Sequence, residues 1–226
     1  MLAKLDEHAR TDLLHRGRRV DHPADTVLIR LGERTTHVLV VLDGHVKVIT
    51  YSDSGKTVLL ALRSRGDLVG EIAGMDHSPR MATIETAGPV STRVLTAREF
   101  HLFLDDHPTA GRAMSAYIGS KLRSATERIL DYSSHNVADR LARVLLRLAR
   151  DHGVPTPEGL SLNVRVSQPE LASIISASEA ALQKALTELR DKGVVTTGYR
   201  TLTVTDADEL CRRAGLPPNS LAIPHL

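Results

Sequence analysis

The chain has 226 residues, of which 42% are hydrophobic, 25% are charged and only 3% are aromatic, and its formal net charge is +2. That length suits one large domain or two modest ones with aliphatic cores, and so small a positive charge does not by itself indicate a nucleic-acid partner. The single cysteine, Cys211, excludes an intrachain disulfide and a cysteine-ligated iron–sulfur cluster. No apolar run reaches about 18 residues, and acids stand where a signal peptide would be apolar, so we expect a cytoplasmic protein with no membrane partner.

The first part of the chain combines a helix with a series of strands. A short amphipathic helix is expected over residues 2–16, and from residue 20 to about 96 short β-rich runs alternate with turn glycines. The expected strands are 26–30, 38–42, 45–51, 57–62, 82–87 and 90–95. Many short strands with regular turns indicate a β-roll or barrel rather than a sheet built from βαβ units.

The stretch from Gly70 to Ile84 carries the most informative motif. It reads G-E-[apolar]-A, then a short loop, then P-R-x-A-T-[apolar]. The guanidinium of Arg80 can pair with two phosphate oxygens, and backbone N–H groups of a short helical turn can bind the same anion. The ionised carboxylate of Glu71 can only accept hydrogen bonds, which suits a sugar hydroxyl. This combination is typical of a cyclic-nucleotide site.

The stretch resembles the phosphate-binding cassette of cyclic-nucleotide-binding domains. The resemblance implies that Glu71 binds the ribose 2′-hydroxyl and Arg80 the cyclic phosphate. The family often has Ser or Thr after this arginine, where this chain has Met81. Domains of this kind can also keep the roll and lose the nucleotide, so occupancy stays open. The candidate residues of this site in the roll are Gly70, Glu71, Ile72, Ala73, Arg80 and Met81.

A long helix is expected after the roll. Thr96 and Glu99 form a capping box for a short helix over 96–104, and a longer helix of about 37 Å follows Pro108. Two copies could pair along its apolar residues into a homodimer, or these residues could pack on the chain's own roll. A roll of this size cannot cover so long a helix, which favours the homodimer. The near-heptad apolar positions are Met114, Ile118, Leu122, Ala125, Ile129 and Tyr132.

The last part of the chain predicts a winged helix-turn-helix. Residues 133–136 break the helical pattern and are expected to form a hinge, with Asn136 capping the next helix. Ser167 and Glu170 form a second capping box at the start of a short helix. The expected elements are helices at 137–151, 169–175 and 179–192, and strands at 160–166, 194–197 and 201–205, with Tyr199 and Arg200 at the tip of the wing.

The order of these elements resembles the Crp–Fnr (catabolite activator protein) superfamily of bacterial transcription regulators, in its cyclic-AMP-receptor-like branch, over residues 2–205. The resemblance implies an α+β fold with a cyclic-nucleotide-binding β-roll (1–107), a dimerisation helix and hinge (108–135) and a winged helix-turn-helix (136–226). It also implies a cytoplasmic homodimer that binds a palindromic double-stranded DNA operator and that cyclic AMP controls allosterically, with RNA polymerase as a further candidate partner. The single cysteine excludes the oxygen-sensing branch.

The expected recognition helix departs from the family pattern. Glu179 and Ala180 stand where the family has Arg and Glu, and Lys184 stands where a later arginine would be. Glu179 can accept from a cytosine amino group or instead cap the helix and repel phosphate, and Gln183 can pair with an adenine edge. The candidate DNA-binding residues are Ser167, Gln168, Ser178, Glu179, Gln183, Lys184 and Arg200.

Alternative functions remain open. Relatives that respond to nucleotides place two hydroxyl residues of the long helix against the adenine, whereas this chain has Ala125 and Thr126 there. The pocket could therefore be empty or take a different effector. Residues 137–226 hold eleven Lys/Arg and ten Asp/Glu, so a nucleotide-sensing interaction module with degenerate DNA binding is a further alternative. The histidines form no HExxH grouping and no Walker loop occurs, so we expect no enzyme and no metal site.

Overall fold

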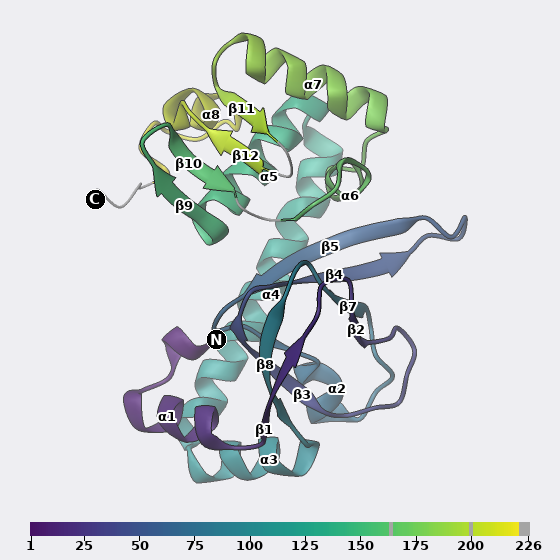
Figure 1. Cartoon of the computed structure of the whole chain (residues 1–226), viewed down its shortest axis with the longest axis vertical. Helices are drawn as coiled ribbons and strands as arrows, with labels where there is room; N and C mark the ends of the chain where they lie inside the picture. The colour runs from purple at the N-terminus through teal and green to yellow at the C-terminus, as the bar shows by residue number, and fades with distance from the viewer. Residues whose placement is uncertain (163–164, 199–200, 222–226) are drawn as a thin grey trace. The chain divides into compact units, whose positions relative to one another are not determined.

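The computed structural model describes residues 1–162, 165–198 and 201–221 (Figure 1). The chain forms two compact units, unit 1 over Met1–Thr126 and unit 2 over Glu127–Leu226. These units group residues by packing, and the functional division at residues 107 and 135 stays a prediction. The α+β architecture expected from the sequence, with a β-roll, a long helix and a helix-turn-helix, is confirmed.

Unit 1 contains a roll of two antiparallel four-stranded sheets, with strand orders β1-β8-β3-β6 and β2-β7-β4-β5. Strands β4 and β5 form the long hairpin visible in Figure 1. Strands β1 and β6 were missed because β1 is mostly charged and β6 has only two residues. The strands are β1 (Arg18–His22), β2 (Val27–Ile29), β3 (Val38–Asp43), β4 (His45–Tyr51), β5 (Thr57–Ser64), β6 (Leu68–Val69), β7 (Thr83–Thr86) and β8 (Val90–Leu95).

The N-terminal segment corrects one expectation. Instead of one helix over residues 2–16, the chain makes a 3-10 turn, η1 (Leu2–Lys4), and then α1 (Glu7–His15). Asp6 causes the break, because its carboxylate accepts the amide N–H of Ala9 at 2.8 Å and so caps a new helix.

Three helices share one core with the roll. These are α1, α3 (Ala97–Asp106) and the first part of α4 (Pro108–Ser134). Thr96 and Glu99 form the predicted capping box at the start of α3. Phe100 and Phe103 of α3 are fully buried, and each such side chain contributes roughly 1.5–3 kcal/mol of hydrophobic stabilisation. A second core inside the roll consists of Ile29, Leu39, Val41, Val46, Val69, Ile84 and Val90.

The apolar residues of α4 change environment along the helix. Met114 is buried in the core of unit 1, as the packing alternative predicts. Further along, Leu122 is 67% exposed, Ile129 is 65% exposed and Leu130 is 58% exposed. The single chain therefore leaves the second half of the apolar face of α4 uncovered.

Unit 2 contains one antiparallel sheet of order β11-β12-β10-β9 and several helices. Its core includes the buried residues Leu141, Leu145, Leu182 and Leu189. The elements are α5 (Val137–His152), β9 (Gly153–Thr156), β10 (Gly159–Leu162), α6 (Gln168–Ile174), α7 (Glu179–Asp191), β11 (Val195–Gly198), β12 (Thr201–Val204) and α8 (Ala207–Arg213).

Three expectations about unit 2 need correction. Helix α4 continues through Ser134, so the expected hinge at 133–136 is limited to residues 135 and 136. Residues 153–156, which follow the helix expected at 137–151 and were not expected to form a strand, make strand β9, which pairs with β10. Strand β10 is described to Leu162, residues 163 and 164 of the strand expected over 160–166 lie outside the described residues, and residues 165 and 166 are not in a strand. The predicted cap at Asn136 is confirmed by a hydrogen bond of 3.0 Å from the Asp139 amide.

Helices α6 and α7 form the helix-turn-helix. Ser167 and Glu170 form the predicted capping box of α6. The turn passes through Ser176, whose φ of 50° is left-handed although the residue is not glycine. Ser178 caps α7, since its hydroxyl accepts the amide N–H of Ala181 at 3.2 Å.

Among the described residues, no helix has the length and apolar character needed to span a membrane. Over the same residues, no three His, Cys, Asp or Glu side chains gather in a way that could hold a metal ion. Cys211 is a buried free thiol on α8.

Candidate functional site

A cavity of about 210 Å³ opens in unit 1 beside the cassette motif. It lies where α2 (Glu71–Asp76) follows strand β6, next to strands β2, β4, β5 and β7 and to Lys121 of α4. All six residues that the sequence proposes for this site in the roll line the cavity. The lining residues are Ile29, Val48, Leu60, Arg63, Val69, Gly70, Glu71, Ile72, Ala73, Arg80, Met81, Ala82, Ile84 and Lys121.

Gly70 allows the Arg80 side chain to pack closely against the start of α2. Its φ of 79° lies in the left-handed region, and it precedes the first turn of α2. A Cβ atom at this position would lie 2.7 Å from Nη1 of Arg80 and 2.8 Å from Cδ1 of Ile29. Only glycine therefore fits here without displacing the arginine.

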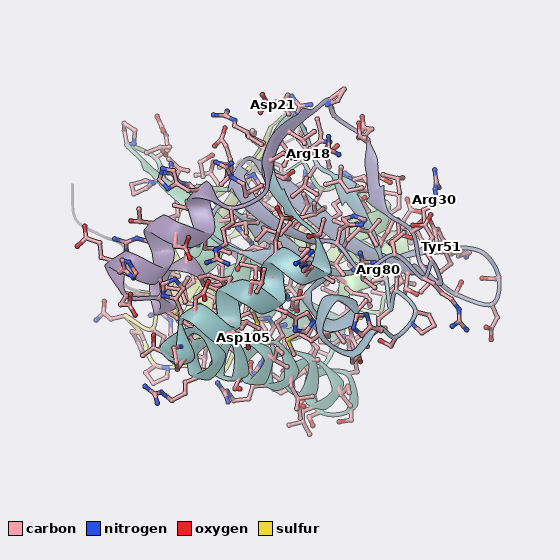
Figure 2. The ribbon with its side chains drawn as sticks, turned by 90° about the horizontal axis from the view of Figure 1, so that it is seen from below. Arg18, Asp21, Arg30, Tyr51, Arg80 and Asp105 are labelled. Carbon is pink, nitrogen blue, oxygen red and sulfur yellow. The ribbon has the colours of Figure 1, made fainter. Side chains whose placement is uncertain are left out.

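Arg80 is a buried cation held by the chain itself. The residue is only 3% exposed, and Figure 2 labels it nearer the middle of the view than Arg30 and Tyr51. Its Nη1 donates to the Gly70 carbonyl at 2.8 Å and its Nη2 to the His37 carbonyl at 2.7 Å. Burial lowers the pKa of the guanidinium, but arginine stays charged in proteins.

Two further contacts orient the Arg80 guanidinium. Its Nε donates to Oγ1 of Thr35 at 3.1 Å, and Nη2 lies 3.3 Å from Nδ1 of His37. Burial and the neighbouring Arg80 charge lower the pKa of His37, so its ring is neutral at pH 7 and Nδ1 can accept. Sequence reasoning missed Thr35 and His37, because a loop between strands carries no spacing pattern that would indicate them.

Glu71 is buried opposite a lysine of the long helix. It is 3% exposed, and its Oε1 accepts a hydrogen bond from Nζ of Lys121 at 2.8 Å. Lys121 also donates to the Leu68 carbonyl at 3.0 Å and lies 4.4 Å from the ring centre of Tyr117. Burial lowers the pKa of Lys121, and the nearby Glu71 charge opposes that shift.

Lys121 was not among the predicted site residues. A signal for it exists in the sequence, because it follows Tyr117 by one helical turn on the packed side of α4. A cation on the packed side of a helix needs a partner, and the buried carboxylate of Glu71 supplies it. The lysine thus connects the cassette to the long helix.

Ala125 and Thr126 do not line the cavity in the single chain. Ala125 lies about one turn beyond Lys121 on α4 and is half-buried. The hydroxyl of Thr126 donates to the Leu122 carbonyl at 3.0 Å, which is a bond within the helix. Their predicted contact with a base stays a prediction.

The predicted DNA-binding residues that the structure describes lie at the starts of α6 and α7 and along α7. Ser167 and Ser178 are helix caps, which corrects the alternative that Glu179 caps α7. Glu179 is instead the exposed first residue of that helix, and Lys184 is exposed further along it. Gln168 and Gln183 are joined by a hydrogen bond from Nε2 of Gln183 to Oε1 of Gln168. Arg200 lies outside the described residues.

Two side chains outside the helix-turn-helix hold its turn. Arg140 of α5 donates from Nε to the Ile175 carbonyl at 2.8 Å and from Nη2 to the Ser176 carbonyl at 3.2 Å. Tyr132, near the end of α4, donates to the Ile174 carbonyl at 3.0 Å. These bonds satisfy carbonyls at the end of α6 that the helix itself cannot satisfy. Sequence reasoning assigned Tyr132 to the apolar face and gave Arg140 no role.

Comparison with known families assigns both units. The cyclic nucleotide-binding domain family matches residues 19–107, and the Crp-like helix-turn-helix domain family matches residues 139–213. The chain belongs to the Crp–Fnr superfamily. It is a DNA-binding transcription regulator of the Crp type, with a cyclic-nucleotide-binding domain and a helix-turn-helix domain.

Curated relatives agree with this assignment. The chain is 26% identical over 197 residues to the "CRP-like cAMP-activated global transcriptional regulator" of Mycobacterium tuberculosis strain H37Rv, covering 86% of this chain and 87% of that protein. It is 22% identical over 185 residues to the "cAMP-activated global transcriptional regulator CRP" of Escherichia coli O157:H7, covering 81% and 87%. These relatives are transcription regulators and not enzymes.

Solved structures share the fold. The c-di-GMP responsive global regulator CLP of Xanthomonas campestris matches with a TM-score of 0.74 and 21% identity, covering 88% of this chain and 99% of that chain. A CRP-family transcriptional regulator from Thermus thermophilus also matches with a TM-score of 0.74, at 23% identity and 88% and 98% coverage. At these identities the likeness supports the fold alone.

Proposed function

We propose that this Crp–Fnr regulator is a cytoplasmic homodimer that binds a palindromic DNA operator under the control of a cyclic nucleotide, with cyclic AMP as the first candidate. The observation that carries the proposal is that two buried charged residues line one cavity. Arg80 would bind the cyclic phosphate there, and Glu71 would bind the ribose 2′-hydroxyl. The curated relatives named as cAMP-activated support the choice of nucleotide.

The present hydrogen-bond acceptors of Arg80 are weaker than a cyclic phosphate would be. The guanidinium donates to the neutral carbonyls of Gly70 and His37. A cyclic phosphate carries a charge, and charge-assisted hydrogen bonds are roughly twice as strong as neutral ones. The nucleotide would therefore compete for these donors.

The coupling to DNA would run through Lys121. A ribose hydroxyl that donates to Glu71 would compete with Lys121 for the carboxylate, and Lys121 belongs to α4. A ligand shifts an equilibrium only if it binds one state better, so nucleotide must favour the arrangement of α4 that binds the operator. RNA polymerase would be contacted by the DNA-bound dimer.

The uncovered part of α4 supports the homodimer. Leu122, Ile129 and Leu130 are large apolar residues that are more than half exposed on one helix. Burying an apolar side chain of this size stabilises by roughly 1.5–3 kcal/mol. Pairing with α4 of a second copy would cover these residues in both chains at once.

Calorimetric titration of the full chain with cyclic AMP, cyclic GMP and cyclic di-GMP tests the effector. We expect saturable binding of cyclic AMP, and Arg80→Ala should weaken it about 10-fold or more because a charge-assisted hydrogen bond contributes roughly 1.5–3 kcal/mol. Arg30→Ala, which removes an exposed arginine of the same roll, is the matched control and should bind normally. No binding of any of the three nucleotides would reject the effector role.

A second candidate is a regulator of the same fold with a different effector. Ala125 lacks the hydroxyl that relatives use for adenine, and one structural relative is described as c-di-GMP responsive. Preferential binding of cyclic GMP or cyclic di-GMP in the same titration would favour this candidate. The nearly neutral charge of residues 137–226 keeps a protein-interaction role as a third possibility, which operator selection from random DNA tests directly.

A further inference from the structure

Two side-chain amides meet on the surface that α6 and α7 present. Gln168 is the first residue of α6, and Gln183 lies at the fifth position of α7. They are the only glutamines in the sequence, and Nε2 of Gln183 donates a hydrogen bond to Oε1 of Gln168. Gln168 is exposed and Gln183 is half-buried, so the pair lies at the surface.

The hydrogen bond leaves Gln183 with the capacity to bind a base. A glutamine amide has two N–H groups and a carbonyl oxygen, and the bond to Gln168 uses one N–H. The second N–H and Oε1 then form one donor beside one acceptor. In the major groove, adenine offers the complementary pattern, with N7 as acceptor and the N6 amino group as donor, whereas guanine offers two acceptors.

Gln168 also restricts the orientation of that amide. If the Gln183 amide turned over while Gln168 kept its orientation, its Oε1 would face Oε1 of Gln168, and two acceptors cannot form a hydrogen bond. The pairing therefore opposes the orientation that would present the whole amino group to the two acceptors of guanine. The amino group of Gln168 stays available for a phosphate oxygen, since the first helix of a helix-turn-helix crosses the DNA backbone. That contact would hold Oε1 of Gln168 toward Gln183, because a phosphate oxygen needs a donor.

We propose that Gln168 and Gln183 form a paired-amide element that reads adenine, in which Gln183 contacts N6 and N7 of the base and Gln168 fixes its orientation and contacts the neighbouring phosphate. The inference rests on the proposed binding of an operator through α7. It makes adenine, and not guanine, the preferred base at one position of each half-site.

Selection of bound sites from random double-stranded DNA by the full chain, with and without cyclic AMP, tests the base preference. We expect a palindrome with adenine enriched at one position of each half-site. Replacing that adenine by 7-deazaadenine removes N7 and should weaken binding about 2- to 12-fold, as for one lost hydrogen bond. Gln183→Ala should bind both operators equally and lose the preference, while Glu188→Ala on the same helix should keep it.

Variants at position 168 test the orientation. Gln168→Ala should relax the preference from adenine towards adenine or guanine. Gln168→Glu still accepts from Gln183, so it should keep the preference for adenine while it lowers affinity for every operator, because a carboxylate replaces the phosphate donor. Equal base preferences in these two variants would overturn the role of Gln168.

Two different failures can be told apart. Enrichment of no palindrome would reject the proposed operator binding itself. A palindrome whose bases are selected identically by the unchanged chain and by Gln183→Ala would leave operator binding intact and overturn the paired-amide inference. Melting temperatures of all variants, measured by circular dichroism, show whether each variant is folded.

Discussion

Nζ of Lys121, on helix α4, lies 2.8 Å from Oε1 of Glu71, on helix α2, and Glu71 is almost fully buried. The two residues are fifty positions apart in the sequence, and they join the cassette to the long helix. Removing one member of a buried ion pair leaves the other charge without compensation, which is more costly than removing both.

Lys121→Met should therefore destabilise unit 1 by about 3 kcal/mol, since it keeps the apolar stem and removes the charge. Glu71→Gln in the same chain should restore most of that loss, because no unpaired carboxylate remains. Urea unfolding followed by circular dichroism measures both. Lys121→Arg, which keeps the charge, is the control. Equal stability of the single and double variants would show that the pair carries no such energy.

Gly70→Ala tests the closure of the cassette. The new Cβ would lie 2.7 Å from Nη1 of Arg80, and the residue would have to adopt φ near 79°. Gly55→Ala is a matched control, because Gly55 has a φ of 76° and a Cβ added there would have nothing within 4 Å. We expect the control to cost roughly 1–2 kcal/mol for the left-handed conformation alone.

The Gly70 variant should lose more stability than the control, and its cyclic-nucleotide affinity should fall, because Arg80 must move. Chemical unfolding and calorimetry of the two variants give the comparison. Equal losses in stability with unchanged affinity in both would mean that Gly70 serves only its own backbone conformation.

The exposed apolar residues of α4 predict a dimer that a charge can dissociate. Leu122→Glu combined with Ile129→Glu places two carboxylates on the face proposed for pairing. We expect a dimer for the unchanged chain and a monomer for the double variant in analytical ultracentrifugation. Leu102→Glu, at an exposed leucine of α3, is the control and should stay dimeric. A dimer that survives the double substitution would place the interface elsewhere.

His37 predicts a pH dependence of stability. Burial, and then the neighbouring Arg80 charge, lower the pKa of its imidazole below the ordinary value of 6.5. The unfolded chain therefore binds the proton more readily than the folded chain, so the contribution of His37 to stability is present above about pH 6.5 and is lost as the pH falls below it.

The charged groups near His37 are Arg80, which lowers its pKa, and Glu33, which raises it, and a hydrogen bond to the Leu28 backbone also raises it. His37→Asn should show a smaller loss of unfolding free energy between pH 7.5 and 5.5 than the unchanged chain. Denaturant titrations at several pH values give that difference, and His15→Asn, at an exposed histidine of α1, controls for surface histidines. Identical pH dependence in all three proteins would contradict the prediction.

Local patterns were enough to predict most elements and the chemistry of the cassette. Capping boxes at Thr96 and Ser167 and the cap at Asn136 depend on residues three positions apart, so the sequence states them directly. The same holds for the glycine, carboxylate and arginine of the cassette, whose spacing in the chain is short. The predicted ends of elements were wrong where a single side chain sets the start of a helix. At Asp6 the carboxylate caps a new helix inside the segment expected to be one helix.

Contacts between distant segments could only come from the tertiary structure. Lys121 reaches Glu71, His37 reaches Arg80, and Gln183 reaches Gln168, and nothing in the spacing of these residues indicates that they meet. A hydrogen bond depends on atoms within about 3 Å, and folding sets that distance by packing whole elements together. The sequence therefore determines which chemical groups are present, and the packing of α4 on the roll and of α6 on α7 decides which of them act together.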